Sequence, residues 1–180
     1  MADSWVPLYQ RYEHGYCLVS GCVPFQYKVD RSTKNGTHQA IELLMVTNQG
    51  GPVLLFPKGR WETDETAQEA ACREAYKEAG VHGDLKGYIG AWDFKSNRLQ
   101  SYLSPVGLCR AYMFALLVKE ALDFLPEGNA QEWHWWMKRV LEQCILHLNN
   151  GQIDTPSAST LPSNPLTTDT PLPSHLSVRV

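Results

Sequence analysis

The sequence lacks a hydrophobic run long enough to cross a membrane. Its longest apolar stretch, residues 111–118, falls far short of the ~20 residues that a membrane-spanning helix needs. The first twenty residues carry Asp3 and Glu13 and contain no continuous apolar core, unlike a secretory signal or a transit peptide. We therefore expect no membrane association and a location in the cytoplasm, the nucleus or both, with import into an organelle left open.

The sequence also has little that indicates disulfides, zinc or bulk binding of nucleic acid. Its five cysteines form no CxxC pair, and its six histidines show no HExxH pattern. Buried free thiols in a reducing compartment explain such cysteines best. Only 19% of the residues are charged and the formal net charge is -3, which argues against coating of nucleic acid by electrostatics alone. We expect no stable nucleic-acid binding, and the sequence does not indicate an oligomeric state.

Composition divides the chain into a domain and a tail. With 180 residues, of which 43% are hydrophobic, the chain can build one packed domain, which we place at residues 1–150. Residues 151–180 contain five prolines, ten serines or threonines, three charged residues and no aromatic residue. Such a stretch buries too little apolar surface to offset the entropy of ordering, so we predict a disordered Pro/Ser/Thr-rich tail at residues 151–180.

β-Strands make up most of the predicted domain. Runs of β-branched, aromatic and aliphatic residues predict strands at residues 16–23, 40–47, 53–56, 85–94 and 110–118. Pro24 is expected to close the first of them, because proline donates no backbone hydrogen bond. Polar residues predict a loop at residues 30–39 and a turn at residues 48–51.

One strong helix lies between the third and fourth of these strands. Thr66 and Glu69 fit a capping box, T-x-x-E, which places the helix start at Thr66, and Gly80 supplies the C-terminal stop. The alanines of one face are Ala67, Ala71 and Ala75. They recur every four residues, so this thin face can pack closely on a sheet. A second helix is predicted at about residues 137–148.

Two glutamates on the first helix form a candidate metal site. Glu74 and Glu78 lie four residues apart, hence on one helix face. Carboxylates on neighbouring turns can share a divalent cation, and these hard oxygen ligands suit Mg²⁺, which also keeps waters and binds substrate phosphates. An arbitrary pair of glutamates at this spacing is more often a solvated acidic face. The surrounding sequence decides between these two interpretations.

The segment from Gly59 onward resembles the Nudix box. It reads GRWETDETAQEAACREAYKEAGV, against the pattern G-x5-E-x7-R-E-U-x-E-E-x-G-U, in which U is aliphatic. The fixed positions that match at the required spacing are Gly59, Glu65, Arg73, Glu74, Glu78 and Gly80. At average residue usage, six such matches arise by chance about once in ten million start positions. The match therefore favours a metal site.

The resemblance to the Nudix hydrolase family implies both a fold and a chemistry. The implied fold is an α/β/α sandwich with a mixed β-sheet. The implied reaction is Mg²⁺-dependent hydrolysis of a phosphoanhydride bond in a polyphosphorylated small molecule, with Mn²⁺ as a possible substitute. By the same resemblance, Glu74, Glu78 and the carbonyl of Gly59 hold the metal.

The resemblance also assigns roles around the metal. Arg73 would orient the glutamates with Glu65 as its partner, whereas an ordinary surface pair with Glu69 is the alternative. The general base is not fixed by the sequence. Glu78 is the best candidate within the box, and Glu120 is a weaker one.

Flanking segments resemble a plant subgroup of Nudix hydrolases related to diphosphoinositol polyphosphate phosphohydrolases. The resemblance covers approximately residues 9–144 and is carried by Gln10-Arg11-Tyr12, LVSGCVPF at 18–25, LLFPKG at 54–59, Trp61-Glu62 and GAWDFKS at 90–96. It implies a substrate such as a diphosphoinositol polyphosphate or a dinucleoside polyphosphate. Cations that could hold its phosphates by charge-assisted hydrogen bonds are Lys58, Arg60, Lys95 and Arg98.

Three positions depart from the family pattern. Lys77 stands where the box has a glutamate, and a salt link from Lys77 to Glu74 would compete with metal. Arg60 replaces a second glycine, and Cys17 replaces a basic residue. Two alternatives to the polyphosphate hydrolase therefore stay open. One is a catalytically weakened Nudix-fold binding module, and the other is a Nudix enzyme for ADP-ribose or another nucleoside diphosphate derivative.

Overall fold

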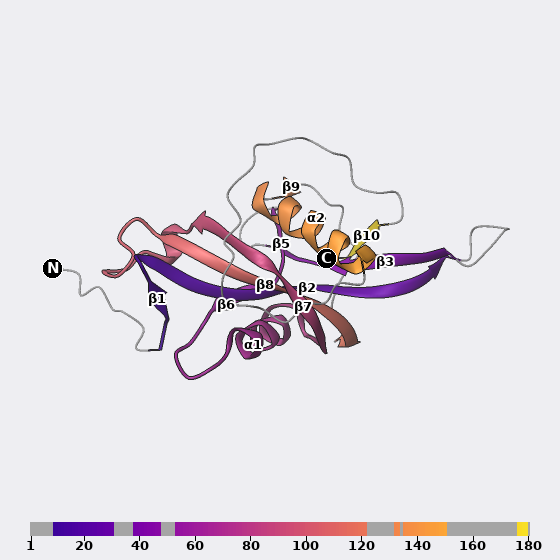
Figure 1. The fold of residues 1–180 in the computed structure, drawn as a ribbon, viewed down its shortest axis with the longest axis horizontal. Helices are drawn as coiled ribbons and strands as arrows, with labels where there is room; N and C mark the ends of the chain where they lie inside the picture. Colours follow the sequence, from indigo (N-terminus) through magenta and orange to yellow (C-terminus); the bar gives the residue numbers. More distant parts are fainter. Residues whose placement is uncertain are drawn as a thin grey trace.

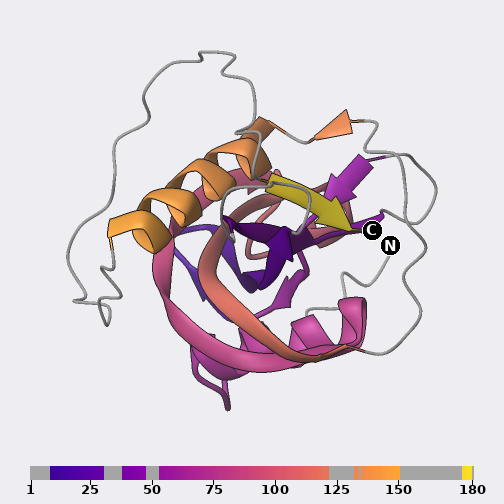
Figure 2. The ribbon, with the colours of Figure 1, turned by 90° about the vertical axis from the view of Figure 1, so that its right-hand side faces the viewer.

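A mixed β-sheet lies between two α-helices in the part of the chain that the structure describes. This computed structural model describes residues 9–30, 38–47, 53–121, 132–133, 135–150 and 176–179. Helix α1 (Ala67–Ala79) covers one face of the large sheet and helix α2 (Trp135–Asn150) covers the opposite face (Figures 1 and 2). The predicted α/β/α arrangement with a mixed sheet is therefore confirmed. None of the described helices is both long and apolar enough to cross a membrane.

The large sheet has the strand order β10-β3-β2-β8-β7, and β1 and β6 also pair with β2. Its strands are β1 (Tyr12–Glu13), β2 (Tyr16–Asp30), β3 (His38–Leu44), β6 (Lys58–Arg60), β7 (Val81–Lys95), β8 (Leu108–Ala121) and β10 (Leu176–Arg179). Strand β2 runs parallel to β8 and antiparallel to β3 and β6. The small sheet contains β4 (Val46–Thr47), β5 (Val53–Leu55) and β9 (Glu132–Trp133). A 3₁₀ turn, η1 (Asn97–Leu99), follows β7.

Two apolar clusters hold the helices on the sheet, one on each face. The cluster beneath α2 includes Val19, Phe25, Met113, Trp136, Val140 and Leu141. The cluster beneath α1 includes Cys22, Leu44, Ala71, Ala75, Val81, Phe114 and Leu116. Successive residues of β8 divide between the clusters, as the alternation of a strand requires. On the thin alanine face of α1, Ala71 and Ala75 are buried and Ala67 is half-buried, which lets the helix lie close to the strands that carry the site.

Helix α1 begins and ends where its sequence predicts. Thr66 caps it by accepting from the backbone N–H of Glu69, and the Glu69 carboxylate accepts from the Thr66 N–H at 2.8 Å. Gly80 ends the helix at φ 63°, a left-handed conformation that favours glycine. Helix α2 begins two residues before the predicted start, at Trp135, and continues to Asn150.

The strands of the large sheet are longer than predicted, and Pro24 does not end the first one. Strand β2 runs through Pro24, which pairs with Leu116 in β8. The N–H of Cys22 donates to Pro57, so the nitrogen of Pro24 faces the same side of β2. On that side the pairing partner changes from β6, at residues 19–21, to β3, whose C-terminal end pairs with Phe25. The missing donor of Pro24 falls into this gap.

The predicted strand at 40–47 is interrupted at Met45, which separates β3 from β4. The tail prediction also needs a correction, because residues 176–179 form β10. This strand pairs in parallel with β3, from Leu176 opposite Ile41 to Arg179 opposite Leu44. The edge of β3 offers unpaired backbone groups, and a composition averaged over thirty residues hides so short a strand. The rest of the predicted tail, residues 31–37 of the predicted loop and the predicted turn at 48–51 lie outside the described residues. The two ends of the predicted loop are instead part of strands, since β2 extends to Asp30 and β3 begins at His38.

Candidate active site

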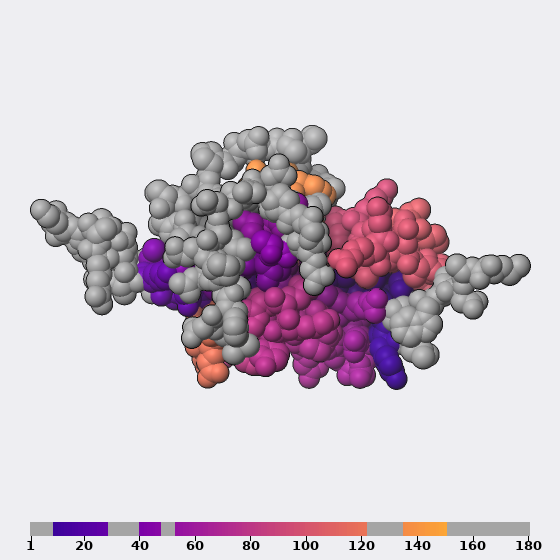
Figure 3. Space-filling view, turned by 180° about the vertical axis from the view of Figure 1, so that it is seen from behind, coloured from indigo at the N-terminus to yellow at the C-terminus, as the bar shows by residue number. Residues whose placement is uncertain are grey.

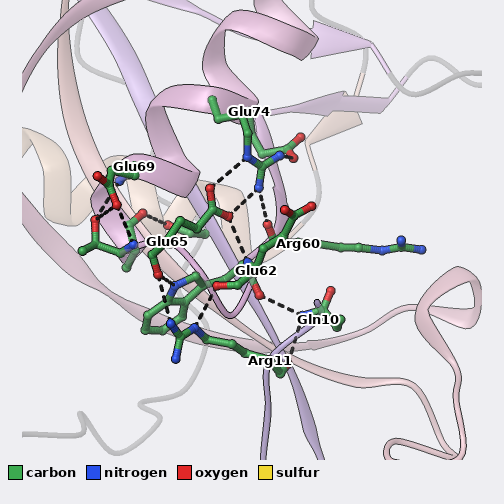
Figure 4. Close-up of polar contacts among 12 residues, drawn as sticks. Gln10, Arg11, Arg60, Glu62, Glu65, Glu69 and Glu74 are labelled. Atoms are coloured by element: carbon green, nitrogen blue, oxygen red, sulfur yellow. Dashed lines mark hydrogen bonds and ion pairs between the residues drawn. The ribbon is translucent and has the colours of Figure 1, made fainter. Parts of the chain in front are cut away.

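An ion-pair cluster joins α1 to the segment that precedes it (Figure 4). The guanidinium of Arg73 donates to both carboxylate oxygens of Glu65, from Nε at 2.9 Å and from Nη2 at 2.6 Å. Its Nη2 also donates to the carbonyl of Arg60 at 2.8 Å, and its Nη1 bonds the carboxylate of Glu74. This guanidinium holds the pKa of Glu65 below its usual range. The expected partner Glu65 is confirmed, whereas Glu69 caps the helix instead.

The carboxylate of Glu74 is buried against the backbone of Gly59. The Glu74 side chain is only 3% exposed. A Cβ added to Gly59 would lie 2.2 Å from Cδ of Glu74 and 2.3 and 2.6 Å from its two oxygens. Only glycine leaves room for this carboxylate at that position. Strand β6 places Gly59 opposite Ser20, and the Ser20 hydroxyl donates to the carbonyl of Ala67 at 2.6 Å. Strands β2 and β6 and the first turn of α1 are thereby tied together.

Glu78 meets the same strand one helical turn further on. The backbone N–H of Lys58 donates to Oε2 of Glu78 at 3.0 Å. Although Glu78 as a residue is exposed, desolvation of its carboxylate against β6 raises its pKa. The ammonium of Lys58 lies 5.8 Å from the ring centroids of both Phe94 and Trp136, and burial lowers the pKa of Lys58. The three residues assigned to the metal, Gly59, Glu74 and Glu78, therefore come together.

Lys77 forms the salt link that its position in the sequence predicts. Its ammonium lies 3.7 Å from Oε2 of Glu74, three residues earlier on α1. The charge of Lys77 also acts on Glu78, where it lowers the pKa against the larger effect of desolvation. A largely exposed cation, with 68% of its side chain accessible, thus acts on both carboxylates.

The donors fit a single hard divalent cation. The cradle at Gly59, which a Cβ would fill, brings a buried carboxylate against backbone, and Glu78 touches the adjacent residue of β6. No group of three or more His, Cys, Asp or Glu side chains suited to a metal occurs among the described residues. Two carboxylates and a backbone carbonyl would leave further positions to water and substrate phosphate, which is the coordination that Mg²⁺ prefers.

The predicted phosphate-binding cations are not all near this centre. Lys58 and Arg60 flank Gly59 on β6, and the side chain of Arg60 extends away from the ion-pair cluster in Figure 4. Lys95 pairs with Leu108 of β8. Leu108 lies five residues before Met113, which is aligned through Gly21 with Lys58. Lys95 is therefore roughly 16 Å along the sheet from the level of Lys58.

Arg98 belongs to η1, in the connection between β7 and β8 that Figure 3 shows as a rounded mass at one end of the molecule. Both Lys95 and Arg98 are exposed. Glu120, the weaker candidate for the general base, pairs with His82. His82 lies at the start of β7, four residues beyond Glu78. The register therefore places Lys95 and Arg98 away from the carboxylates, and among the described residues Glu120 makes no contact with Glu74 or Glu78.

Sequence reasoning assigned no role to Arg11 and Trp61, which position the loop before α1. Arg11 donates to the carbonyls of Glu62, Thr63 and Glu65 at 2.9, 2.8 and 3.0 Å. Its guanidinium lies 4.8 Å from the ring centroid of Trp61, and the indole N–H of Trp61 donates to the Glu65 carbonyl at 3.0 Å. Both residues lie in the segments that resemble the plant subgroup. That resemblance singles them out, but it does not indicate that they contact each other.

The comparisons with known proteins agree with this geometry. The NUDIX domain family matches residues 33–144, more than half of the chain. Nudix hydrolase 16, mitochondrial, from Arabidopsis thaliana is 47% identical over 139 residues, covering 76% of this chain and 77% of that protein. Diphosphoinositol polyphosphate phosphohydrolase 3-alpha from Mus musculus is 33% identical over 97 residues, covering 51% of this chain and 54% of that protein.

A solved structure shares the fold at low sequence identity. The NUDIX domain of Shewanella oneidensis NrtR, determined with ADP ribose, has a TM-score of 0.50 and 12% identity. The match covers 76% of this chain and 94% of that one. Fold, site geometry and sequence matches agree: this chain belongs to the Nudix hydrolase family, enzymes that cleave phosphoanhydride bonds and generally use divalent metal cations.

Proposed function

We propose that this chain is a Mg²⁺-dependent hydrolase of a polyphosphorylated small molecule, such as a diphosphoinositol polyphosphate or a dinucleoside polyphosphate. One observation carries the proposal: the carboxylate of Glu74 is buried over Gly59, and the carboxylate of Glu78, one helical turn further along α1, accepts a hydrogen bond from the adjacent residue of β6. Burial of a carboxylate is costly, and here it produces a site for a hard cation.

The ligands of the cation would be Glu74, Glu78 and the carbonyl of Gly59, and Mn²⁺ could replace Mg²⁺. When bound, the ion neutralises phosphate oxygens and lowers the pKa of an attacking water. Arg73 is the positioning residue, because it bonds Glu74 while both oxygens of Glu65 hold it in place. A fixed guanidinium keeps the carboxylate in one orientation, so the enzyme loses little energy in reorganising the site.

Glu78 is the candidate general base. Its Oε2 accepts the N–H of Lys58, so Oε1 is the atom that would take a proton. Desolvation raises the pKa of Glu78, which brings it closer to neutral pH and makes the carboxylate a better base than an ordinary glutamate.

Lys58 and Arg60 support a substrate rich in phosphate. They flank Gly59 on β6, but the side chain of Arg60 extends away from the ion-pair cluster and the ammonium of Lys58 lies over Phe94 and Trp136. Each would therefore bind a phosphate by charge-assisted hydrogen bonds at some distance from the metal. Lys95 and Arg98 are exposed at a distance, so they would contact only the remote end of a long substrate. The similarity to a diphosphoinositol polyphosphate phosphohydrolase favours the first substrate class. Relatives named mitochondrial add import into an organelle to the proposed locations in cytoplasm and nucleus.

A binding module without turnover is the second candidate, and the ion pair between Lys77 and Glu74 favours it. The two functions are separated by incubating the full chain with Mg²⁺ and a panel of diphosphoinositol polyphosphates, dinucleoside polyphosphates and ADP-ribose, with the products resolved. We expect release of phosphate or a nucleotide from a member of the first two classes.

Glu78→Gln is the test variant, because the amide keeps the shape of the side chain and removes its charge. It should lower kcat at least about a hundredfold. Glu142→Gln, on an exposed part of α2, is the matched control and should leave kcat unchanged. Tight binding of a substrate without any product would favour the binding module, and equal activity of Glu78→Gln and wild type would refute the metal assignment.

A further inference from the structure

The carboxylates around the proposed metal centre are balanced by resident cations. The three carboxylates belong to Glu65, Glu74 and Glu78, and the three cations to Arg73, Lys77 and Lys58. These six groups therefore have a formal net charge of zero. A cluster without net negative charge attracts a divalent ion far less than its two metal-facing carboxylates would alone.

Of the three cations, Lys77 is the one whose charge is available to act on both Glu74 and Glu78. The guanidinium of Arg73 is committed to Glu65, Glu74 and the Arg60 carbonyl. The ammonium of Lys58 lies on the α2 face, over Phe94 and Trp136. The ammonium of Lys77 lies 3.7 Å from Oε2 of Glu74. Lys77 also directly precedes Glu78 in α1.

Lys77 also has an ordinary structural role. It lies in the last turn of α1, where any cation stabilises the negative end of the helix dipole. That role does not depend on where the ammonium points within the turn. The 3.7 Å contact with a buried ligand carboxylate is specific, and it is this contact that affects metal binding.

We propose that Lys77 is a resident cation of the metal centre that takes the place of a second divalent ion. The inference rests on the proposed function, since it presumes that Glu74 and Glu78 hold a metal. The free protein then holds a single divalent ion, and holds it weakly. The phosphates of the substrate supply the missing negative charge, so that metal and polyphosphate bind together. In that complex the ammonium of Lys77, beside Glu74, would supply positive charge to phosphate oxygens in place of a second metal.

The size of the effect follows from Coulomb's law. A unit charge about 6 Å from a divalent ion changes its binding by about tenfold, even at the dielectric constant of water. Lys77→Gln removes one charge and adds no ligand. Lys77→Glu changes the charge by two units and adds a third carboxylate beside the other two. The two variants therefore separate an effect on affinity from an effect on the number of ions.

The test is a titration of the full chain with Mn²⁺ in the absence of substrate, with free Mn²⁺ read by electron paramagnetic resonance. We expect one weak site in wild type and one site about tenfold tighter in Lys77→Gln. Lys77→Glu should bind two ions. Lys138→Glu, an exposed lysine on α2 at the opposite face of the sheet, makes the same change in total charge and should titrate like wild type.

Two ions bound by wild type, or unchanged binding in both Lys77 variants, would overturn the inference. Glu78→Gln distinguishes this failure from failure of the proposed function. If Glu78→Gln loses Mn²⁺ while the Lys77 variants match wild type, the metal centre stands and Lys77 has only its helix role. If wild type and Glu78→Gln bind Mn²⁺ equally, the centre is not at these glutamates and both proposals fail.

Discussion

Replacing Gly59 with alanine should displace the carboxylate of Glu74 while leaving the protein folded. The added Cβ would lie 2.2 Å from Cδ of Glu74, whereas ordinary contact begins at 3.4 Å, so the carboxylate must move by about 1 Å. Because the Glu74 side chain is 3% exposed and bonded to Arg73, that movement breaks an ion pair or pushes into packed neighbours. No backbone strain contributes at Gly59, since its φ is not left-handed.

The expected losses differ in size for rate and for stability. A misplacement of about 1 Å at a catalytic group costs roughly a hundredfold in rate. Overpacking at one position lowers the free energy of unfolding by about 1–3 kcal/mol. Steady-state kinetics gives kcat/KM, and urea denaturation followed by circular dichroism gives the free energy of unfolding. Mn²⁺ affinity should fall together with kcat/KM, because the same carboxylate serves both.

Gly15→Ala is the matched control for this substitution. Gly15 has φ 81° and no heavy atom within 4 Å of a Cβ built on it. The alanine there adds backbone strain of about 1 kcal/mol without touching the site, so stability should fall and kcat/KM should not. Glu74→Asp in the Gly59→Ala background withdraws the carboxylate by one methylene and should regain part of the Mn²⁺ affinity. Wild-type kcat/KM and Mn²⁺ affinity in Gly59→Ala would refute the steric argument.

Three further predictions concern Glu65, Glu78 and β10. Glu65→Gln should lower the free energy of unfolding by about 1–3 kcal/mol at neutral pH. Because Arg73 lowers the pKa of folded Glu65, its contribution is present above the ordinary glutamate pKa and lost as pH falls through the lowered value, so the denaturation curves of variant and wild type should converge in acid. The raised pKa of Glu78 predicts that kcat/KM at limiting Mg²⁺ rises with pH through a value above the ordinary glutamate range, and a flat profile there would contradict it. Deletion of residues 176–180 should lower Tm by about 2–4 °C and speed amide exchange at residues 41–44, whereas unchanged exchange would argue against the β10 pairing.

Local features of the fold could be predicted because their causes lie within a few residues. The cap at Thr66 depends on Glu69, three residues on, and the stop depends on the conformational freedom of Gly80 itself. The lengths of the strands depend on their neighbours instead. Pro24 is accommodated because it lies in the gap between the pairing of β2 with β6 and the pairing of β2 with β3, and no pattern within residues 16–30 reveals where those pairings stop.

The candidate site shows the same contrast between local features, which the sequence predicts, and long-range contacts, which it does not. The spacing of Glu74 and Glu78 on one helix places them on one face, so the sequence predicts their proximity. Arg11 reaches Glu62 and Glu65 across about fifty positions, and such a contact has no local signature. Lys95 was expected near the phosphates because it ends a strand. The register with β8 places that strand end beyond the carboxylates, which only the pairing of the strands reveals.

Glu74→Gln tests whether the burial of Glu74 serves the metal or only the ion pair with Arg73. Removing one partner of a buried pair usually costs about 3–5 kcal/mol, because the other charge is left uncompensated. Here Arg73 keeps both oxygens of Glu65 and the Arg60 carbonyl, and the amide oxygen of glutamine can still accept from it. We therefore expect a loss below about 1 kcal/mol in metal-free buffer.

The two roles separate when metal is added. A ligand that binds only the folded state stabilises it by about 2.7 kcal/mol at a hundred times its Kd. Mn²⁺ should therefore raise Tm of wild type and not that of Glu74→Gln, in which kcat should also fall. A purely structural ion pair predicts the opposite pattern, with a large loss of stability in metal-free Glu74→Gln and no effect of Mn²⁺ on either protein. If Glu74→Gln keeps the stability of the metal-free protein but loses the stabilisation by Mn²⁺, the carboxylate of Glu74 serves metal binding and not the fold.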